Sequence, residues 1–548
     1  MNAQSLLTKW WSDAAVYQVY PRSFFDENGD ALGDLAGVQS KLSYLLELGI
    51  NAIWLSPFYP SPQHDSGYDV ADQRGVDPMY GVMTDVDELI ESAHELGLKI
   101  MVDLVPNHVS IEHPWFAAAL ASSPGSVERS RFHFVDSSDG PPNNWASMFG
   151  GPAWTRIAEK DGSPGQWYLH VFDSSQPDLN WTNPEVAADW ISTLKFWLDA
   201  GVDGFRVDVA HGLAKDMTYA NLPDPIGLTQ ALRFDLDDGS PEAAARRLLI
   251  ENSGFFDRDE LQEIYRTWRE VLDSYPGDRM AVCEAWVPAH RAGRYVSPTS
   301  LHQIFGFDFL VVPWDSEIMQ DTIYRAIAAV EVVGAPPTWA LSNHDSPRVV
   351  TRLGGGLKGL ARARALAMVA HALPGCVYVY QGEELGLPDA PLADSDRQDP
   401  VFFRTNGSQK GRDGARVPLP WSGNQPPYGF TESVNPTWLP QPRDWAQLTV
   451  SSQQDQPSST LSLYSQSLKL RAGFTGAASF MESGDSAVMI CHRDQGIYCV
   501  INTGNNEYLL PEFLQTAEVL LDSESVRALG DKTDVLPPDC ARWFRVTT

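Results

Sequence analysis

Cysteine is scarce in this chain: its 548 residues include only five, Cys283, Cys376, Cys491, Cys499 and Cys540. An odd, widely spaced set argues against a disulfide framework, and without a Cys-x-x-Cys pair it argues against a zinc site. A reducing, cytoplasmic location is therefore expected. The chain also lacks any run of 18 or more apolar residues and any secretory leader pattern at its start, so neither a membrane span nor export is predicted.

Basic residues are few as well. Lys and Arg number 40 against 71 Asp and Glu, which gives a formal net charge of −31. Nucleic acid and anionic membranes both require clustered positive charge, so the composition excludes them as partners. It favours a soluble protein with neutral or cationic ligands.

Short apolar runs alternate with helical patterns along most of the chain. Strands are predicted at 16–20, 52–55, 100–104, 204–207, 280–283, 304–310, 338–341 and 377–380. Helices are predicted between them at 38–48, 86–96, 183–200 and 260–272, and a last barrel helix is predicted after them at 461–471. Repeated βα units build a parallel sheet, and eight of them predict a (β/α)8 TIM barrel, an α/β fold.

Two segments depart from this alternation. Residues 106–175 are irregular and rich in Ser, Pro, Gly and Trp, which predicts an inserted domain after the third strand. From residue 473 to 548 the pattern becomes that of short antiparallel strands, which predicts a C-terminal β domain. The barrel then comprises 1–105 and 176–472. Within it, the long polar segment 209–256 is interpreted as a lid over the acceptor side of a binding site.

Polar side chains follow the predicted strands at their carboxyl ends, the face where barrel active sites form. They are Asp103, His108, Arg206, Asp208, Glu284, His344 and Asp345. Arg206 and Asp208, two residues apart, point to the same side of their strand. A pocket this rich in carboxylates suits either a divalent metal ion or glycoside cleavage by a carboxylate pair, and spacing alone does not separate the two.

Five motifs in this order resemble the α-amylase superfamily, glycoside hydrolase family 13. They are DLVPNH (103–108), QPDLN (176–180), GFRVDVAH (204–211), CEAW (283–286) and SNHDS (342–346). The segments GYD (67–69) and GRDGARVPLPW (411–421) resemble its α-glucosidase and oligo-1,6-glucosidase branch. The resemblance implies a TIM barrel, a domain B inserted after the third strand and a C-terminal β-sandwich.

The resemblance also implies the catalytic roles. Asp208 matches the nucleophile, Glu284 the general acid/base and Asp345 the third acid, which holds sugar hydroxyls. Arg206 is expected to orient Asp208.

The same resemblance implies how the sugar is held. His108 and His344 match hydroxyl-binding residues, and Tyr68 is expected to stack on the sugar. Asp69, paired with Arg412 or its rival Arg416, is expected to hold the non-reducing end and close the pocket.

An acidic loop follows the first strand. Oxygen atoms of Asp26, Asn28, Asp30 and Asp34, with the Leu32 carbonyl, resemble an EF-hand loop, although Ala31 and Gly37 depart from that pattern. The family's similar loop holds a structural ion, so Ca²⁺ or Mg²⁺ is expected here and no organic cofactor.

The function implied is that of a retaining exo-α-glucosidase, with possible transglucosylation, acting on small neutral α-glucosides as a monomer or homodimer. Val209, next to the nucleophile, hints at α-1,6 activity, although the following Ala210-His211 departs from that branch. The alternatives are a sucrose- or trehalose-rearranging glucosyltransferase and a non-catalytic carbohydrate-binding homologue.

Overall fold

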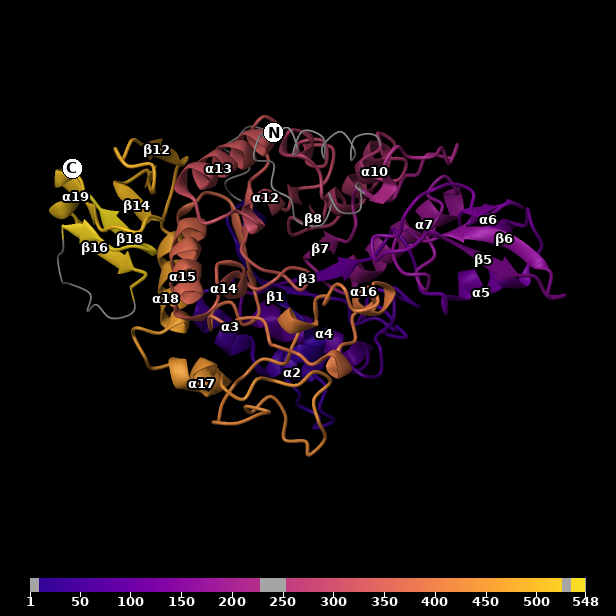
Figure 1. Cartoon of the computed structure of the whole chain (residues 1–548), viewed down its shortest axis with the longest axis horizontal. Coiled ribbons are helices and arrows are strands. Elements are labelled where there is room, and N and C mark those ends of the chain that lie inside the picture. The colour runs from indigo at the N-terminus through magenta and orange to yellow at the C-terminus, as the bar shows by residue number, and fades with distance from the viewer. Residues whose placement is uncertain (1–8, 227–252, 525–533, 548) are drawn as a thin grey trace.

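A barrel of parallel strands forms the centre of the molecule (Figure 1). The structure is a computed structural model that describes residues 9–226, 253–524 and 534–547. Most of the predicted 209–256 lid, from 227 to 252, lies outside these residues. The barrel strands are β1 (Ala15–Val19), β2 (Ala52–Leu55), β3 (Lys99–Leu104), β7 (Gly204–Val207), β8 (Met280–Cys283), β9 (Gln303–Ile304), β10 (Thr338–Ala340) and β11 (Cys376–Tyr380). They pair in the order β10-β11-β1-β2-β3-β7-β8-β9, which confirms the predicted fold class.

Helices follow the strands and cover the outside of the barrel (Figure 1). They include α2 (Leu35–Ser40), α3 (Leu42–Leu48), α4 (Met83–Glu95), α7 (Pro184–Asp199), α10 (Leu261–Asp273), α13 (Ser316–Glu331), α15 (Gly356–Ala372) and α18 (Thr460–Arg471). Their boundaries follow local chemistry. The Asn183 side chain caps α7 by accepting from Glu185 N–H, and α3 ends at Gly49 with φ of 101°, which Gly adopts without a Cβ clash.

The prediction of a strand at 304–310 is wrong beyond Ile304, because β9 ends at that residue. Residues Phe307–Leu310 form a helical turn, α12, in which Phe307, Phe309 and Leu310 are buried. A short apolar run of this kind fits a strand or a buried turn equally well from sequence. The chain leaves the sheet at Gly306, whose N–H donates to the Thr338 hydroxyl at 3.0 Å.

The same hydroxyl spans the seam of the barrel. Thr338 Oγ1 also donates to the Ile304 carbonyl at 2.7 Å, so one side chain connects β10 to the end of β9. No ladder between β9 and β10 occurs among the strands that the structure describes. The threonine therefore supplies the polar contacts that hold the nearly closed sheet together at this point.

Two smaller sheets lie on opposite sides of the barrel (Figure 1). Within 106–175, β4 (Phe134–Val135), β6 (Pro164–Leu169) and β5 (Trp154–Ala158) form a three-stranded sheet beside α5 (Pro114–Ala121) and α6 (Val127–Ser130). The C-terminal sheet is antiparallel, in the order β12 (Ser479–Met481), β13 (Val488–Arg493), β14 (Ile497–Asn502), β18 (Cys540–Arg545) and β16 (Glu518–Asp522). A short pair, β15 (Tyr508–Leu509) and β17 (Val535–Leu536), accompanies it.

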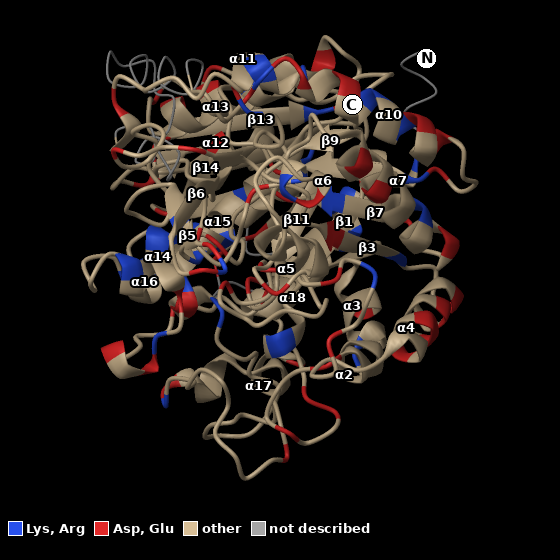
Figure 2. Cartoon of the chain, turned by 90° about the vertical axis from the view of Figure 1, so that its right-hand side faces the viewer, with Lys and Arg blue, Asp and Glu red and all other residues tan. Residues whose placement is uncertain are grey.

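Acidic residues are spread over the surface rather than concentrated at one place, as Figure 2 shows for helices such as α4 and α10. All five cysteines are buried and free. Among the described residues, no helix combines the length and apolar character needed to cross a membrane.

Candidate active site

A cavity of about 750 Å³ opens at the carboxyl ends of the barrel strands. It is lined by Asp65, Tyr68, His108, Asp208, Glu284, Trp286, Asp345 and Arg412, among others. Segments far apart in the sequence thus meet here because parallel strands place all their carboxyl ends on one face. This volume is in the range of pockets that bind small molecules.

Arg206 on β7 lies at the base of the site and contacts three carboxylates. Its Nη1 is 2.7 Å from Asp103 Oδ1 and 2.6 Å from Asp208 Oδ1, and its Nη2 is 2.8 Å from Glu284 Oε2. The guanidinium is buried, with only 2% of the side chain exposed. Its planar fork therefore holds Asp208 and Glu284 in fixed orientations on neighbouring strand ends.

Glu284 is held by two further donors. The Val209 N–H donates to Oε2 at 2.9 Å, and the Trp286 indole N–H donates to Oε1 at 3.2 Å. Val209 has a φ of 45°, which is uncommon for a β-branched residue. This strained backbone directs the amide after Asp208 toward Glu284, so the two acids are linked by main chain as well as by Arg206.

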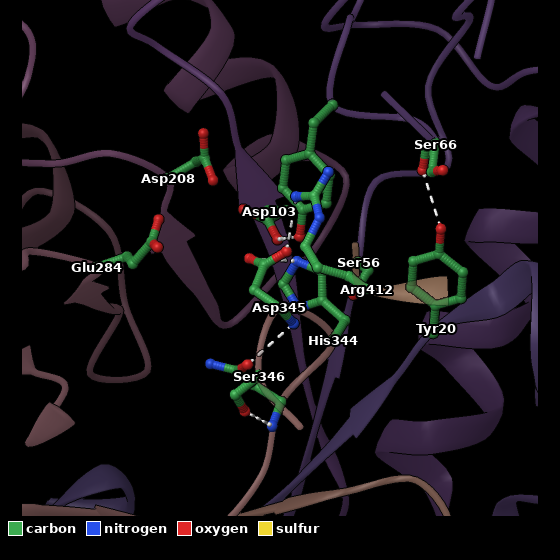
Figure 3. A network of polar contacts seen from close by, with 12 residues as sticks. Tyr20, Ser56, Ser66, Asp103, Asp208, Glu284, His344, Asp345, Ser346 and Arg412 are labelled. Carbon is green, nitrogen blue, oxygen red and sulfur yellow. Dashed lines mark hydrogen bonds and ion pairs between the residues drawn. The ribbon is translucent and has the colours of Figure 1, made fainter. Parts of the chain in front are cut away.

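Asp345 lies across the site from that pair, beside His344 and Arg412 (Figure 3). Its Oδ1 is 2.9 Å from Arg412 Nη1 and 2.7 Å from Arg416 Nη2. The His344 ring stacks on Tyr68 with centroids 5.0 Å apart, and the Tyr68 hydroxyl donates to Asp103 Oδ2 at 3.0 Å. Tyr68 is thus fixed at both its face and its hydroxyl.

The closed end of the pocket differs from the expectation for Asp69. Asp69 is fully buried, and its carboxylate accepts from Ser61 Oγ and from the amides of His64 and Asp65. It is absent from the cavity lining among the described residues. Asp65, four residues earlier, occupies that place, with its Oδ1 2.6 Å from Arg412 Nη2.

The same geometry distinguishes the two arginines. Both contact Asp345, but Arg412 lines the cavity and contacts Asp65, whereas Arg416 is fully buried and donates to the His344 carbonyl at 2.8 Å. Asp399 holds Arg412 from behind at 2.7 Å. Sequence reasoning missed Asp65 and Asp399; for Asp65 the available signal was its place in the loop after the second strand, two residues before the GYD segment.

Burial and charge act together on the acids. Burial and the carboxylates of Glu284, Asp103 and Asp345 raise the pKa of Asp208, against the opposing effect of Arg206. For Asp345 burial acts in the same direction, but His344, Arg412 and Arg416 outweigh it and lower the pKa. The carboxylates of Asp103, Asp208 and Glu284 thus share the single guanidinium of Arg206. Three negative charges beside one positive charge favour the retention of a proton by the cluster.

Aromatic residues line the cavity both next to Glu284 and on the side of the inserted segment. The Trp286 ring stacks on Phe307 with centroids 3.9 Å apart, and Phe149 and Phe172 line the wall contributed by the inserted segment. Such faces suit the C–H surfaces of a sugar.

The acidic loop after β1 closes on itself. Asp26 accepts from the amides of Gly29 and Ala31, and Asp34 accepts from those of Glu27, Asn28 and Gly37. Asn28 and Asp30 accept from the amides two residues on, as in Asx turns. In the described part of the chain, no group of three or more Asp, Glu, His or Cys side chains converges as ion ligands.

Comparison with known proteins agrees with this geometry. Residues 18–475 match the family model for the α-amylase catalytic domain. The oligo-1,6-glucosidase of Heyndrickxia coagulans is 36% identical over 505 residues, which cover 85% of this chain and 86% of that one. A probable α-glucosidase of Rhizobium meliloti strain 1021 is 37% identical over 514 residues, covering 90% and 89%.

Solved structures resemble the whole chain. The α-glucosyl transfer enzyme XgtA has a TM-score of 0.84 at 34% identity and covers 98% of this chain and 100% of its own. The isomaltulose synthase PalI of Klebsiella sp. LX3 has the same TM-score at 29% identity and covers 98% and 99%.

Proposed function

Because the chain belongs to the α-amylase family of glycoside hydrolases, we propose that it is a retaining, exo-acting α-glucosidase for short α-glucosides. The single observation that carries the proposal is the placement of Asp208 and Glu284 on one guanidinium, inside a pocket whose far end is closed by Asp65 and Arg412.

The chemistry would proceed in two displacements. The Asp208 carboxylate attacks the anomeric carbon while Glu284 donates its proton to the glycosidic oxygen, so the aglycone leaves and a covalent β-glucosyl-enzyme forms. Glu284, now a carboxylate, takes a proton from water, which attacks the same carbon and releases Asp208. Two inversions give net retention, and a sugar hydroxyl in place of water gives transglucosylation.

Closure of the pocket supports exo action. Asp65 and Arg412 join two loops and both line the cavity. In this proposal they bind hydroxyls of a terminal glucose. In this proposal Asp65 takes the role that the sequence assigned to Asp69. Tyr68 and His108 line the cavity that would hold this sugar, whereas His344, also predicted to bind it, is not among the described lining residues and stacks on Tyr68. Asp345 is held ionised to bind the sugar hydroxyls.

Product analysis tests this function. The purified chain is incubated with maltose, isomaltose, sucrose and trehalose, and the first product is followed by proton NMR. We expect α-glucose to appear before mutarotation, and maltose and isomaltose to be cleaved. β-Glucose as the first product would contradict the retaining mechanism, and no cleavage of any of the four would overturn the assignment.

Isomerisation of sucrose is a second candidate, supported by the likeness to isomaltulose synthase PalI over 98% of the chain. In that reaction the released fructose would attack the glucosyl-enzyme before leaving the pocket. Sucrose as substrate separates the two functions: hydrolysis gives equal glucose and fructose, whereas isomerisation gives isomaltulose or trehalulose.

Two further proposals concern the protein's surroundings. A structural Ca²⁺ or Mg²⁺ would be held by Asp26, Asn28, Asp30, Asp34 and the Leu32 carbonyl. The oxygen-rich loop supports this proposal. The test is whether EDTA lowers the thermal midpoint and added ion restores it.

A cytoplasmic location is supported by five free cysteines, and cell fractionation would test it.

A further inference from the structure

Lys215, in the loop after β7, is a buried cation that does not line the cavity. Its Nζ is 2.9 Å from Asp178 Oδ2 and 2.7 Å from Asn107 Oδ1, and it also donates to the Gly212 carbonyl. Neither Lys215 nor Asp178 has any exposed side chain. Burying an ion pair is costly, so its position directly behind the sugar-binding residues requires an explanation.

The lysine fixes the amide of Asn107. An ammonium group can only donate, so it must face the Asn107 oxygen and not the nitrogen. The Asn107 Nδ2 then faces the His108 ring, 3.1 Å from Nδ1. Because Nδ2 donates, His108 Nδ1 must accept, and the neutral ring carries its proton on Nε2.

The other side of His108 agrees with this tautomer. Its Nε2 lies 3.1 Å from the Tyr68 carbonyl, an acceptor. Gln176 Nε2 also lies 3.1 Å from His108 Nε2, but it is itself a donor and donates to Asp65 Oδ2 at 3.0 Å, so the Tyr68 carbonyl is the acceptor for the His108 N–H. The His108 Nε2–H therefore donates to the Tyr68 carbonyl, so the ring and Tyr68, which both line the cavity, hold each other in place.

Charge acts on His108 from several elements. The charged groups around it are Lys215, Asp178 and, through Gln176, Asp65. Burial lowers the pKa of His108 to about 4; Asp178 raises it and Lys215 lowers it. Lys215 likewise helps lower the pKa of the buried His133 and His211, each to about 3. The lysine thus opposes protonation of three histidines near the site.

We propose that Lys215 is a positioning residue that, through Asn107, holds His108 neutral with its proton on Nε2, so that His108 donates to the Tyr68 carbonyl and keeps both residues in place beside the bound sugar. Asp178 neutralises the charge of the lysine in the low-dielectric interior. The inference rests on the proposed glucosidase function. A protonated His108 would place a cation beside the oxocarbenium-like transition state, which carries positive charge, and would raise the barrier.

The central test is Lys215→Met, which removes the charge but keeps most of the length of the side chain. We expect the acidic limb of kcat/KM for p-nitrophenyl α-glucoside to move to higher pH by about one unit or more, which is a tenfold change in the protonated fraction. Lys215→Arg, which also only donates, should keep the limb at its wild-type position. Lys195→Met, at an exposed site on α7, is the surface control.

Two companion variants make the test specific. Lys215→Met combined with Asp178→Asn removes both charges and should return the limb toward its wild-type position. If Lys215→Met does not fold, Asn107→Asp serves instead, because a carboxylate facing Nδ1 requires a proton there and raises the pKa of His108. A uniform loss of activity at all pH values would show that Lys215 only supports the fold.

NMR of [¹⁵N]histidine-labelled protein reads the tautomer without any turnover. The His108 signals, assigned by comparison with His108→Gln, should show the Nε2–H form in the wild type and a protonated ring at acidic pH in Lys215→Met. An Nδ1–H ring in the wild type would overturn the inference. A correct tautomer in a protein that cleaves no glucoside would instead count against the proposed function.

Discussion

Nη2 of Arg412 lies 2.6 Å from Oδ1 of Asp65, and this ion pair joins two loops whose residues are 347 positions apart in the chain. Both side chains line the cavity, and little of either is exposed. The pair therefore closes one end of the pocket, and in the proposed function the choice of a terminal sugar should depend on it.

Asp65→Asn and Asp69→Asn should have different effects. Asp65→Asn removes the charge opposite Arg412 in the pocket and should lower kcat/KM by roughly a hundredfold, since a site built to bind hydroxyls loses strongly when a charged partner is removed. Asp69→Asn disturbs the acceptor of two loop amides and should mainly lower the thermal midpoint. Steady-state kinetics and calorimetry on both variants check this, and an Asp69 variant with the larger kinetic loss would restore the sequence-based assignment.

Asp208→Asn should abolish turnover of p-nitrophenyl α-glucoside. An amide cannot form the glycosyl ester, so we expect kcat to fall by at least about a thousandfold. Asp455→Asn, at an exposed position, is the matched control and should behave as wild type. Near-normal turnover by the Asp208 variant would exclude its role as nucleophile.

The barrel was predictable because most of its strands are short apolar runs followed by polar residues, with β9 as the exception. The ranges 52–55, 204–207 and 280–283 agree with β2, β7 and β8. The sequence could also place Arg206 and Asp208 together, because residues two apart on a strand share a side.

Side-chain direction in the loops was not predictable. Asp65 and Asp69 both follow the second strand, and only the turn between them decides which one faces Arg412. Ser66 and Gly67 adopt positive φ values of 52° and 106° in that turn. A residue pattern carries no direct record of such a conformation, so the sequence points to Asp69 of the GYD segment and not to Asp65.

Thr338→Val should weaken the barrel seam. The variant keeps the shape of the side chain but removes the hydroxyl that donates to the Ile304 carbonyl and accepts from Gly306 N–H. Leaving these buried backbone groups unpaired should cost about 1–3 kcal/mol in the free energy of unfolding. Denaturant unfolding measures this, with Thr299→Val at an exposed position as control; equal stability of the two variants would mean that the seam contacts contribute little.

Glu383→Gln should stabilise the protein at alkaline pH. Burial raises the pKa of Glu383 from 4.5 to about 8, so the folded protein keeps a proton that the unfolded chain releases above pH 4.5. The free energy of unfolding therefore falls as the pH rises from about 4.5 to 8. The amide introduced by Glu383→Gln does not titrate, so the variant avoids this fall, and the amide oxygen can still accept from the Tyr464 hydroxyl. We expect the variant's thermal midpoint to exceed that of the wild type at pH 8 and the difference to shrink toward pH 5. Glu432→Gln, at an exposed position, should show no such trend, and a constant difference at both pH values would contradict the protonated state of Glu383.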